Sequence, residues 1–216
     1  MLKKICNKMI WKTKVFFNQK KITNRDFTVI SQNCLGGVIY HDYGMNFYSP
    51  TINMFIEDEN FLKLIENLEY YLSLEAEPYI ERFQDPFDSN ISYPKIKVGD
   101  IELCCLHYKN CQDAIDAWER RKKRVNLNNV YVIGNTWNLH NNKELVERLC
   151  KFNKYKVLCF TNTDEFQFDN CIRLKGDFWR VDERGIVRPN ITDFIPRSIK
   201  RYYEEQFDFI SWFNDK

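Results

Sequence analysis

The order of apolar segments between residues 129 and 161 constrains the fold most. "NNVYVIGNT" and "YKVLCFTNT" are short β-prone runs, and the segment between them places Leu145, Leu149 and Phe152 at helical spacing. A strand, a helix and a second strand in this order form a parallel pair with a right-handed crossover. We therefore predict an α/β fold with three layers, in which a mainly parallel sheet carries helices on both faces.

Other segments extend this prediction. Residues 26–32 form a first strand, and residues 94–108 form a hairpin around Gly99 that could add an antiparallel extension to the sheet. Asp58 caps a helix with an apolar inner face. That face consists of Phe61, Leu62, Ile65, Leu68, Tyr71 and Leu72.

Asparagine residues mark the starts of two further helices. Asn110 caps the first, and Asn141 with Glu144 forms a capping box for the helix of the crossover. A short strand follows at residues 171–174, and an aromatic-rich helix ends the chain.

The length of 216 residues fits one compact unit. Residues 1–25 are predicted to be a basic amphipathic segment, and residues 26–216 a single α/β domain that could divide into two lobes near residue 125. Because only seven glycines and six prolines accompany 44% hydrophobic residues, we expect a globular chain.

The N-terminal segment differs from the rest in charge. Its 25 residues hold eight cations and no acid, whereas the whole chain carries a net charge of only +2. Leu2, Ile5, Met9 and Phe16 lie near one helical face, a pattern typical of helices at anionic membrane surfaces. Three interpretations follow for the segment: a helix docked on the protein's own core, a peripheral contact with the inner face of the cell membrane, or a disordered arm. The acidic remainder has no basic stripe, which argues against nucleic acid as a partner.

Cysteine usage indicates a reducing compartment. Cys104 and Cys105 are adjacent, and no secretory signal precedes the eight cysteines, so we expect a cytoplasmic protein without disulfides. The closest spacing to a metal motif, His107 to Cys111, is a single pair. No metal site is predicted.

The loop after the first strand holds the strongest candidate for catalysis. If a helix begins at Leu35, Cys34 lies at its N-terminus, where backbone N–H groups near Gly36 and Gly37 could hold an oxyanion. Either His41 or His107 could act as the base.

Asn33 and Asp42 belong to the same loop region and complete the candidate site. Two other interpretations remain open for Cys34, because cysteine is often buried: it could line a site without reacting, or it could only pack.

The run "ERRKKR", residues 119–124, offers Arg121 and Arg124 as a clamp for phosphate or pyrophosphate. The alternative is a solvated helix end whose cations complement the helix dipole. The chain has no GxGxxG, GxxxxGK[ST], GxSxG or HExxH motif, which argues against dinucleotide oxidoreductases, P-loop enzymes, serine esterases and zinc proteases.

Four blocks of sequence carry a family resemblance. "SQNCLGGVIYHDYGMNFYSPTIN", "LEYYLSLE", "YPKIKVGDIELCCLHYKN" and "AWERRKKRVN" resemble the bacterial domain-of-unknown-function family 1919, whose members are commonly labelled exopolysaccharide biosynthesis proteins. The resemblance implies a setting in capsule or exopolysaccharide production. It adds binding candidates to those already named: Tyr40, Ser49, Thr51 and Asn53.

Together these features predict a group transferase that uses an activated sugar or acyl donor and acts on a sugar or glycolipid acceptor. The alternative is a noncatalytic binding or assembly protein of a polysaccharide-synthesis complex. No cofactor is identified from the sequence.

Overall fold

The structure is a computed structural model that describes residues 2–86, 88, 90–175, 179–181, 187–189 and 191–215. For residues 2–7, 179–181 and 187–189 it describes the backbone alone, so the side chains of Leu2 and Ile5 lie outside the described part. The elements, in chain order, are α1 (Leu2–Lys21), β1 (Thr28–Ser31), α2 (Leu35–Asp42), α3 (Asp58–Glu66), α4 (Leu68–Ser73), β2 (Ala76–Gln84), β3 (Ser92–Val98), β4 (Ile101–Cys104), α5 (Cys111–Lys122), β5 (Val130–Asn135), α6 (Lys143–Lys151), β6 (Lys156–Thr161), β7 (Cys171–Arg173), β8 (Trp179–Val181), β9 (Val187–Pro189), the 3-10 helix η1 (Tyr202–Glu204) and α7 (Phe209–Asn214).

The chain divides into two compact units. One, here the terminal unit, comprises Met1–Arg25, Val38–Asn46 and Arg173–Lys216. The other, here the sheet unit, comprises Asp26–Gly37 and Phe47–Ile172.

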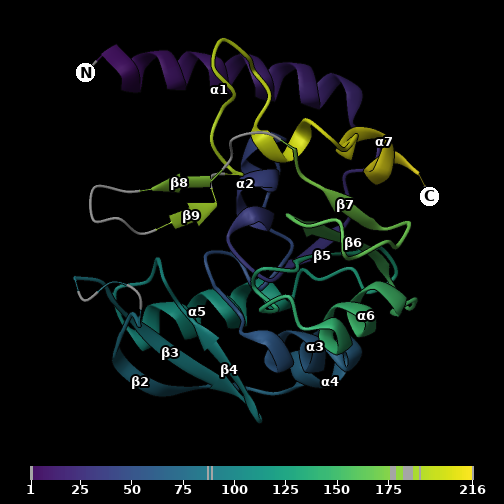
Figure 1. Ribbon diagram of the computed structural model, residues 1–216. Helices are drawn as coiled ribbons and strands as arrows, with labels where there is room; N and C mark the ends of the chain where they lie inside the picture. The colour runs from purple at the N-terminus through teal and green to yellow at the C-terminus, as the bar shows by residue number, and fades with distance from the viewer. Residues whose placement is uncertain are drawn as a thin grey trace. The chain divides into compact units, whose positions relative to one another are not determined.

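A four-stranded sheet in the order β1-β5-β6-β7 confirms the predicted α/β class, and β5 pairs in parallel with both β1 and β6 (Figure 1). Helices flank this sheet. A Cβ at Gly134 of β5 would lie 2.5 Å from Leu149 of α6 and 3.3 Å from Phe61 of α3. On the other face, a Cβ at Gly36 in α2 would lie 3.4 Å from Val29 of β1. Such close packing is typical of buried parallel sheets.

A second sheet of the sheet unit is antiparallel, in the order β2-β3-β4. The predicted hairpin around Gly99 is confirmed as β3 and β4, with Gly99 at φ 60° as the tight turn requires. The hairpin belongs to this separate sheet and does not extend the parallel one. The third strand, β2, was not predicted because it is an edge strand whose residues are mostly exposed, so it lacks an apolar alternation.

Two helix starts differ from the prediction. The N-cap of α3 is Glu57 rather than Asp58, and the expected single helix is interrupted at Asn67, where ψ is 39°. Asparagine disfavours helix interiors because its side chain competes for backbone groups. The cap of α6 is Asn142, whose side chain accepts bonds from Glu144 N and Leu145 N, because Asn141 adopts φ 52° in the preceding turn. The Asn110 cap of α5 is confirmed by a 2.7 Å bond from Asp113 N.

In the terminal unit, the two ends of the chain are hydrogen-bonded to each other. Asn214 Oδ1 accepts from Thr23 N at 2.8 Å, and Asn24 Nδ2 donates to Phe213 O at 2.7 Å. The aromatic C-terminal helix α7 therefore docks beside the end of α1. Along the described part of the chain, no helix is both long and apolar enough to cross a bilayer.

Candidate functional site

The centre of the terminal unit is a buried cluster of charges around Asp42. Its fully buried carboxylate accepts from Arg201 Nε at 2.5 Å and Arg201 Nη2 at 2.8 Å, and from the Tyr203 hydroxyl at 3.2 Å. Lys14 Nζ lies 3.5 Å from the same carboxylate and also pairs with Glu204. Two cations and two carboxylates therefore balance, as burial requires.

Local sequence explains how these side chains meet. Helix α1 turns Lys14 and Asn18 inward, and Asn18 Nδ2 donates to Asp42 O at 3.1 Å, at the end of α2. Arg201 N donates to Glu204 Oε2 at 2.8 Å, which closes the turn η1. Burial disfavours the charge of Arg201, but the hydrogen bonds and charge of Asp42 outweigh it and raise the Arg201 pKa.

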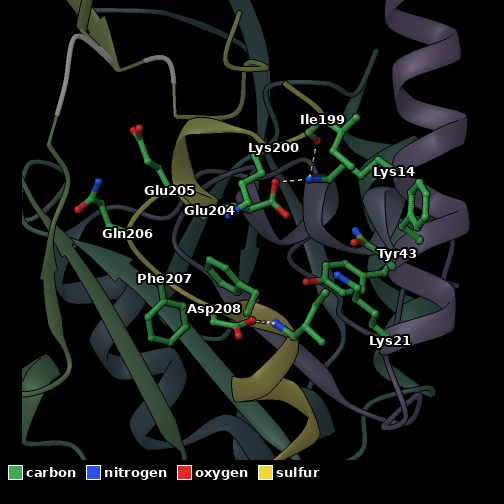
Figure 2. Close-up of a pocket in the computed structure, with 14 residues that line it drawn as sticks. Lys14, Lys21, Tyr43, Ile199, Lys200, Glu204, Glu205, Gln206, Phe207 and Asp208 are labelled. Carbon is green, nitrogen blue, oxygen red and sulfur yellow. Dashed lines mark hydrogen bonds and ion pairs between the residues drawn. The ribbon is translucent and has the colours of Figure 1, made fainter. Parts of the chain in front are cut away.

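A pocket of about 590 Å³ adjoins this cluster in the terminal unit (Figure 2). This volume is within the range of small-molecule sites, roughly 300–1,000 Å³. Its walls come from α1, from Tyr43 directly after α2, and from the segment 199–210. The lining combines aromatic rings with charged and amide groups: Lys14, Phe17, Asn18, Lys21, Tyr43, Ile199, Lys200, Glu204, Glu205, Gln206, Phe207, Asp208, Phe209 and Ile210.

Tyr43 is the most informative of these residues. It is only 1% exposed, and its hydroxyl has no hydrogen-bond partner among the described residues. Figure 2 shows this hydroxyl directed into the pocket. Burial raises the pKa of the phenol, so the hydroxyl is neutral and can both donate and accept. A buried hydroxyl left unpaired costs about 1–3 kcal/mol, so a ligand that pairs with it gains that energy.

The charged groups of the pocket divide into occupied and available ones. Glu204 pairs with Lys14, and the Asp208 carboxylate caps α7 by accepting from Ile210 N and Ser211 N, each at 3.1 Å. Within the described residues, the side chains of Lys21, Lys200 and Glu205 make no ion pair. The three lysines of the lining, Lys14, Lys21 and Lys200, balance its three carboxylates, so the pocket carries no net charge. Lys21 and Lys200 lie outside the Lys14–Glu204 pair and are the cations that an anionic group of a ligand could meet.

The structure places the four predicted catalytic residues in different settings. Asp42 is the ion-pair centre just described. His41 is half-exposed and stacks on Trp11, with ring centroids 4.4 Å apart. Two turns of α2 separate it from Cys34. His107 lies exposed in the turn after β4, and no contact joins it to Cys34 among the described residues.

Among the described residues, no cation or base activates Cys34. Burial raises the pKa of its thiol to about 11, so the thiol is protonated at neutral pH. The nearby backbone donors are occupied, because Gly36 N donates to Ser31 Oγ at 3.0 Å and Gly37 N donates to Cys34 O at 3.1 Å. Asn33 Oδ1 accepts from Leu35 N at 3.0 Å. This geometry stabilises the start of α2.

Several predicted binding residues meet at the loop before α3. Tyr108 donates to Ile52 O at 2.8 Å, and Arg121 Nη1 contacts both the Tyr108 hydroxyl, at 2.5 Å, and Ile52 O, at 3.4 Å. The buried hydroxyls of Ser49 and Thr51 lie 3.0 Å apart. The Arg121 side chain, which is only 9% exposed, thus holds this loop.

The remaining predicted residues are spread more widely. Asn53 adopts φ 64°, and its Oδ1 would lie 3.6 Å from a Cβ at Gly37. Tyr40 is fully buried, whereas the Arg124 side chain is exposed. Arg121 and Arg124 therefore differ in setting, one buried against a loop and one in solvent.

Sequence reasoning missed the pocket because its residues come from three distant segments. Only one signal was visible, the mixture of aromatic and charged residues in "RYYEEQFDF", residues 201–209. The partners of Lys14 and Arg201 could not be read from spacing.

Comparison with known proteins assigns the chain to a family. The profile described as "Domain of unknown function (DUF1919)" matches residues 5–214. A protein of Haemophilus influenzae titled "Uncharacterized protein" is 31% identical over 198 residues, which cover 91% of this chain and 88% of the relative. The match spans both units, and the chain belongs to the DUF1919 family.

Proposed function

We propose that the protein is a noncatalytic binding or assembly protein that holds a sugar phosphate or nucleotide sugar in the pocket of the terminal unit. The observation that carries this proposal is the Tyr43 hydroxyl, which is buried, unpaired among the described residues and directed into a cavity of about 590 Å³.

The chemistry of the lining favours this ligand class. Aromatic rings such as Phe207 and Phe17 offer apolar faces on which the C–H face of a sugar ring can pack. Gln206 and Glu205 provide amide and carboxylate groups for sugar hydroxyls. Lys21 and Lys200 supply cations for a phosphate. A setting in polysaccharide synthesis is part of this proposal.

A ligand screen tests the proposal. We expect a nucleotide sugar or sugar phosphate to stabilise the full-length protein by about 2.7 kcal/mol at a hundredfold excess over its Kd, whereas acyl coenzyme A does not. Lys200→Ala and Phe207→Ala should weaken this effect, while Lys109→Ala, an exposed lysine of the sheet unit, should not. If no sugar ligand shifts the melting temperature, the proposal is wrong.

Group transfer is a second candidate, favoured by Glu205. This carboxylate lies on the pocket without an ion pair among the described residues, and it could accept a proton from an acceptor hydroxyl. Incubation with a bound nucleotide sugar and saccharide acceptors separates the two candidates. Release of nucleotide that Glu205→Gln abolishes supports a transferase, and binding without turnover supports the binding protein.

We also propose that α1 holds the protein against an anionic membrane surface. The helix docks through Lys14 and Asn18, whereas Met9 and Phe16 point away from that face and are 66% and 54% exposed. Lys20 Nζ lies 4.1 Å from the centre of the Phe16 ring, so cations accompany the apolar groups. This combination is typical of interfacial helices.

Vesicle binding tests the membrane proposal. Vesicles that contain anionic lipid should bind the protein at low salt, and the double variant Lys12→Gln/Lys20→Gln should lose about 1 kcal/mol per cation. The matched variant Lys109→Gln/Lys123→Gln changes two exposed lysines of the sheet unit and should bind normally. Equal losses in both variants would contradict the role of α1. Added salt should weaken binding.

A further inference from the structure

Three cysteine thiols meet at one edge of the parallel sheet. Cys150 lies in the last turn of α6, Cys159 lies in β6 and Cys171 begins β7, the strand at the end of the sheet order. Their sulfur atoms all lie within 4.8 Å of one another. Figure 1 shows α6 against β6, and β7 is the next strand of the sheet, which explains how residues so far apart in sequence converge.

We propose that Cys150, Cys159 and Cys171 bind a thiophilic d10 cation, Zn²⁺ or Cu⁺. A donor set of sulfur alone selects such soft ions over Mg²⁺ or Ca²⁺. Because a Zn–S bond is about 2.3 Å long, three sulfurs around one ion are about 4 Å apart. Small inward movements of the observed thiols reach that geometry.

The other buried cysteines of the sheet unit lack this convergence. Cys105 Sγ donates to Leu103 O at 3.5 Å, and Cys111 Sγ donates to Lys95 O at 3.3 Å. Cys159 Sγ also lies 3.7 Å from Phe160 O, but it has two further thiols within 4.8 Å. Within the described residues, only the three proposed ligands form such a group, and all three are free thiols rather than disulfides.

One residue orients all three ligands. Asn170 O accepts from Cys159 N at 2.8 Å, and Asn170 Nδ2 donates to Cys150 O at 2.9 Å. Asn170 also directly precedes Cys171. These bonds fix the backbone at Cys150 and Cys159 and so hold their side chains in the positions from which the thiols converge.

Access and charge agree with the proposal. Cys159 is fully buried and Cys150 is 9% exposed, but Cys171 is partly exposed and opens the cluster to solvent. An ion can enter there, and water can complete the tetrahedron of Zn²⁺. With all three sulfurs bound as thiolates, the site carries a net charge of −1 with Zn²⁺ and −2 with Cu⁺. Burial penalises a net charge of −2 more than one of −1, so the charge balance favours Zn²⁺.

Metal titration of the full-length reduced protein tests this site. Zn²⁺ and Cu⁺ are added separately under anaerobic conditions, each against a chelating dye. We expect one equivalent of one ion to bind, with release of protons. Cys171→Ser, at the partly exposed position, should abolish stoichiometric binding. Asn170→Ala loses only the bond to Cys150 O and should weaken binding about twofold to tenfold. The control Cys105→Ala removes another buried thiol and should bind normally.

Thiol mapping keeps the test independent of variants that fold poorly. Alkylation of the wild-type protein followed by mass spectrometry should show that the bound ion protects Cys150, Cys159 and Cys171 and leaves Cys104, Cys105 and Cys111 unchanged. The proposal is overturned if neither ion binds stoichiometrically, if Cys171→Ser retains binding, or if protection falls on other cysteines.

Discussion

The two units bury their centres with opposite chemistry. The terminal unit surrounds Asp42 with Lys14, Arg201 and Glu204, whereas the sheet unit buries apolar side chains such as Phe61 and Leu149. An apolar core tolerates loss of one side chain in proportion to the cavity left behind. A balanced ionic cluster is less tolerant, because each member removed leaves a charge buried without its partner. The comparison predicts that the terminal unit is most sensitive to loss of a charged side chain, and the sheet unit to loss of a buried apolar one.

The largest expected effect follows from removing the central carboxylate. Asp42→Ala leaves the ammonium of Lys14 and the guanidinium of Arg201 with too little negative charge, and should destabilise the terminal unit by about 3–5 kcal/mol. Denaturant unfolding measures this loss. Asp116→Ala, which removes an exposed carboxylate of the sheet unit, should change stability by about 0.5 kcal/mol or less. Equal effects would show that the cluster is not a stability centre.

A cavity in the sheet unit should have a somewhat smaller effect. Leu149→Ala removes a fully buried side chain between α6 and the sheet and should cost about 2–5 kcal/mol. The loss should be insensitive to salt, since no charge is involved. If the loss caused by Leu149→Ala depends strongly on salt in unfolding measurements, the contrast between an apolar and an ionic centre is wrong.

A smaller effect is expected at the start of α2. Gly36→Ala places a Cβ 2.6 Å from Ser31 Oγ, a clash that should cost about 1–3 kcal/mol. Ser31→Gly removes that oxygen, so the double variant should be less destabilised than the sum of the single ones. Strict additivity in unfolding experiments would contradict this packing account.

The last of these predictions concerns reactivity rather than stability. Because the Cys34 pKa is raised to about 11, the thiolate fraction and the alkylation rate should rise about tenfold per pH unit from pH 7 to 10. Peptide mapping after timed alkylation measures the rate. A plateau near neutral pH would instead identify an activated nucleophile and would favour the transferase.

Much of the sheet unit was predictable because its signals are local. Apolar runs at periods of strands and helices mark β5, α6 and β6, and Asn110 caps α5 through a residue three positions away. The edge strand β2 was not predicted, because its side chains mostly face solvent and its sequence has no apolar alternation.

The sites were less predictable because their contacts join distant residues. No local pattern indicates that Lys14 is buried against Asp42, or that Arg201 pairs with the same carboxylate. The pocket at Tyr43 is formed together with residues of α1 and of the segment 199–210, which are distant in sequence. Cys150, Cys159 and Cys171 have spacings that match no metal motif, so only the fold reveals their convergence.

The measurement that tests the central claim most directly is a comparison of Tyr43→Phe with the wild-type protein. The variant removes only the unpaired hydroxyl, so the free protein should keep or raise its melting temperature, while affinity for the sugar ligand found in the screen falls about fivefold to a hundredfold. The matched variant Tyr203→Phe loses a hydroxyl that bonds to Asp42, and should lower stability without a comparable loss of affinity. If Tyr43→Phe instead lowers the melting temperature and leaves affinity unchanged, the pocket is not the ligand site.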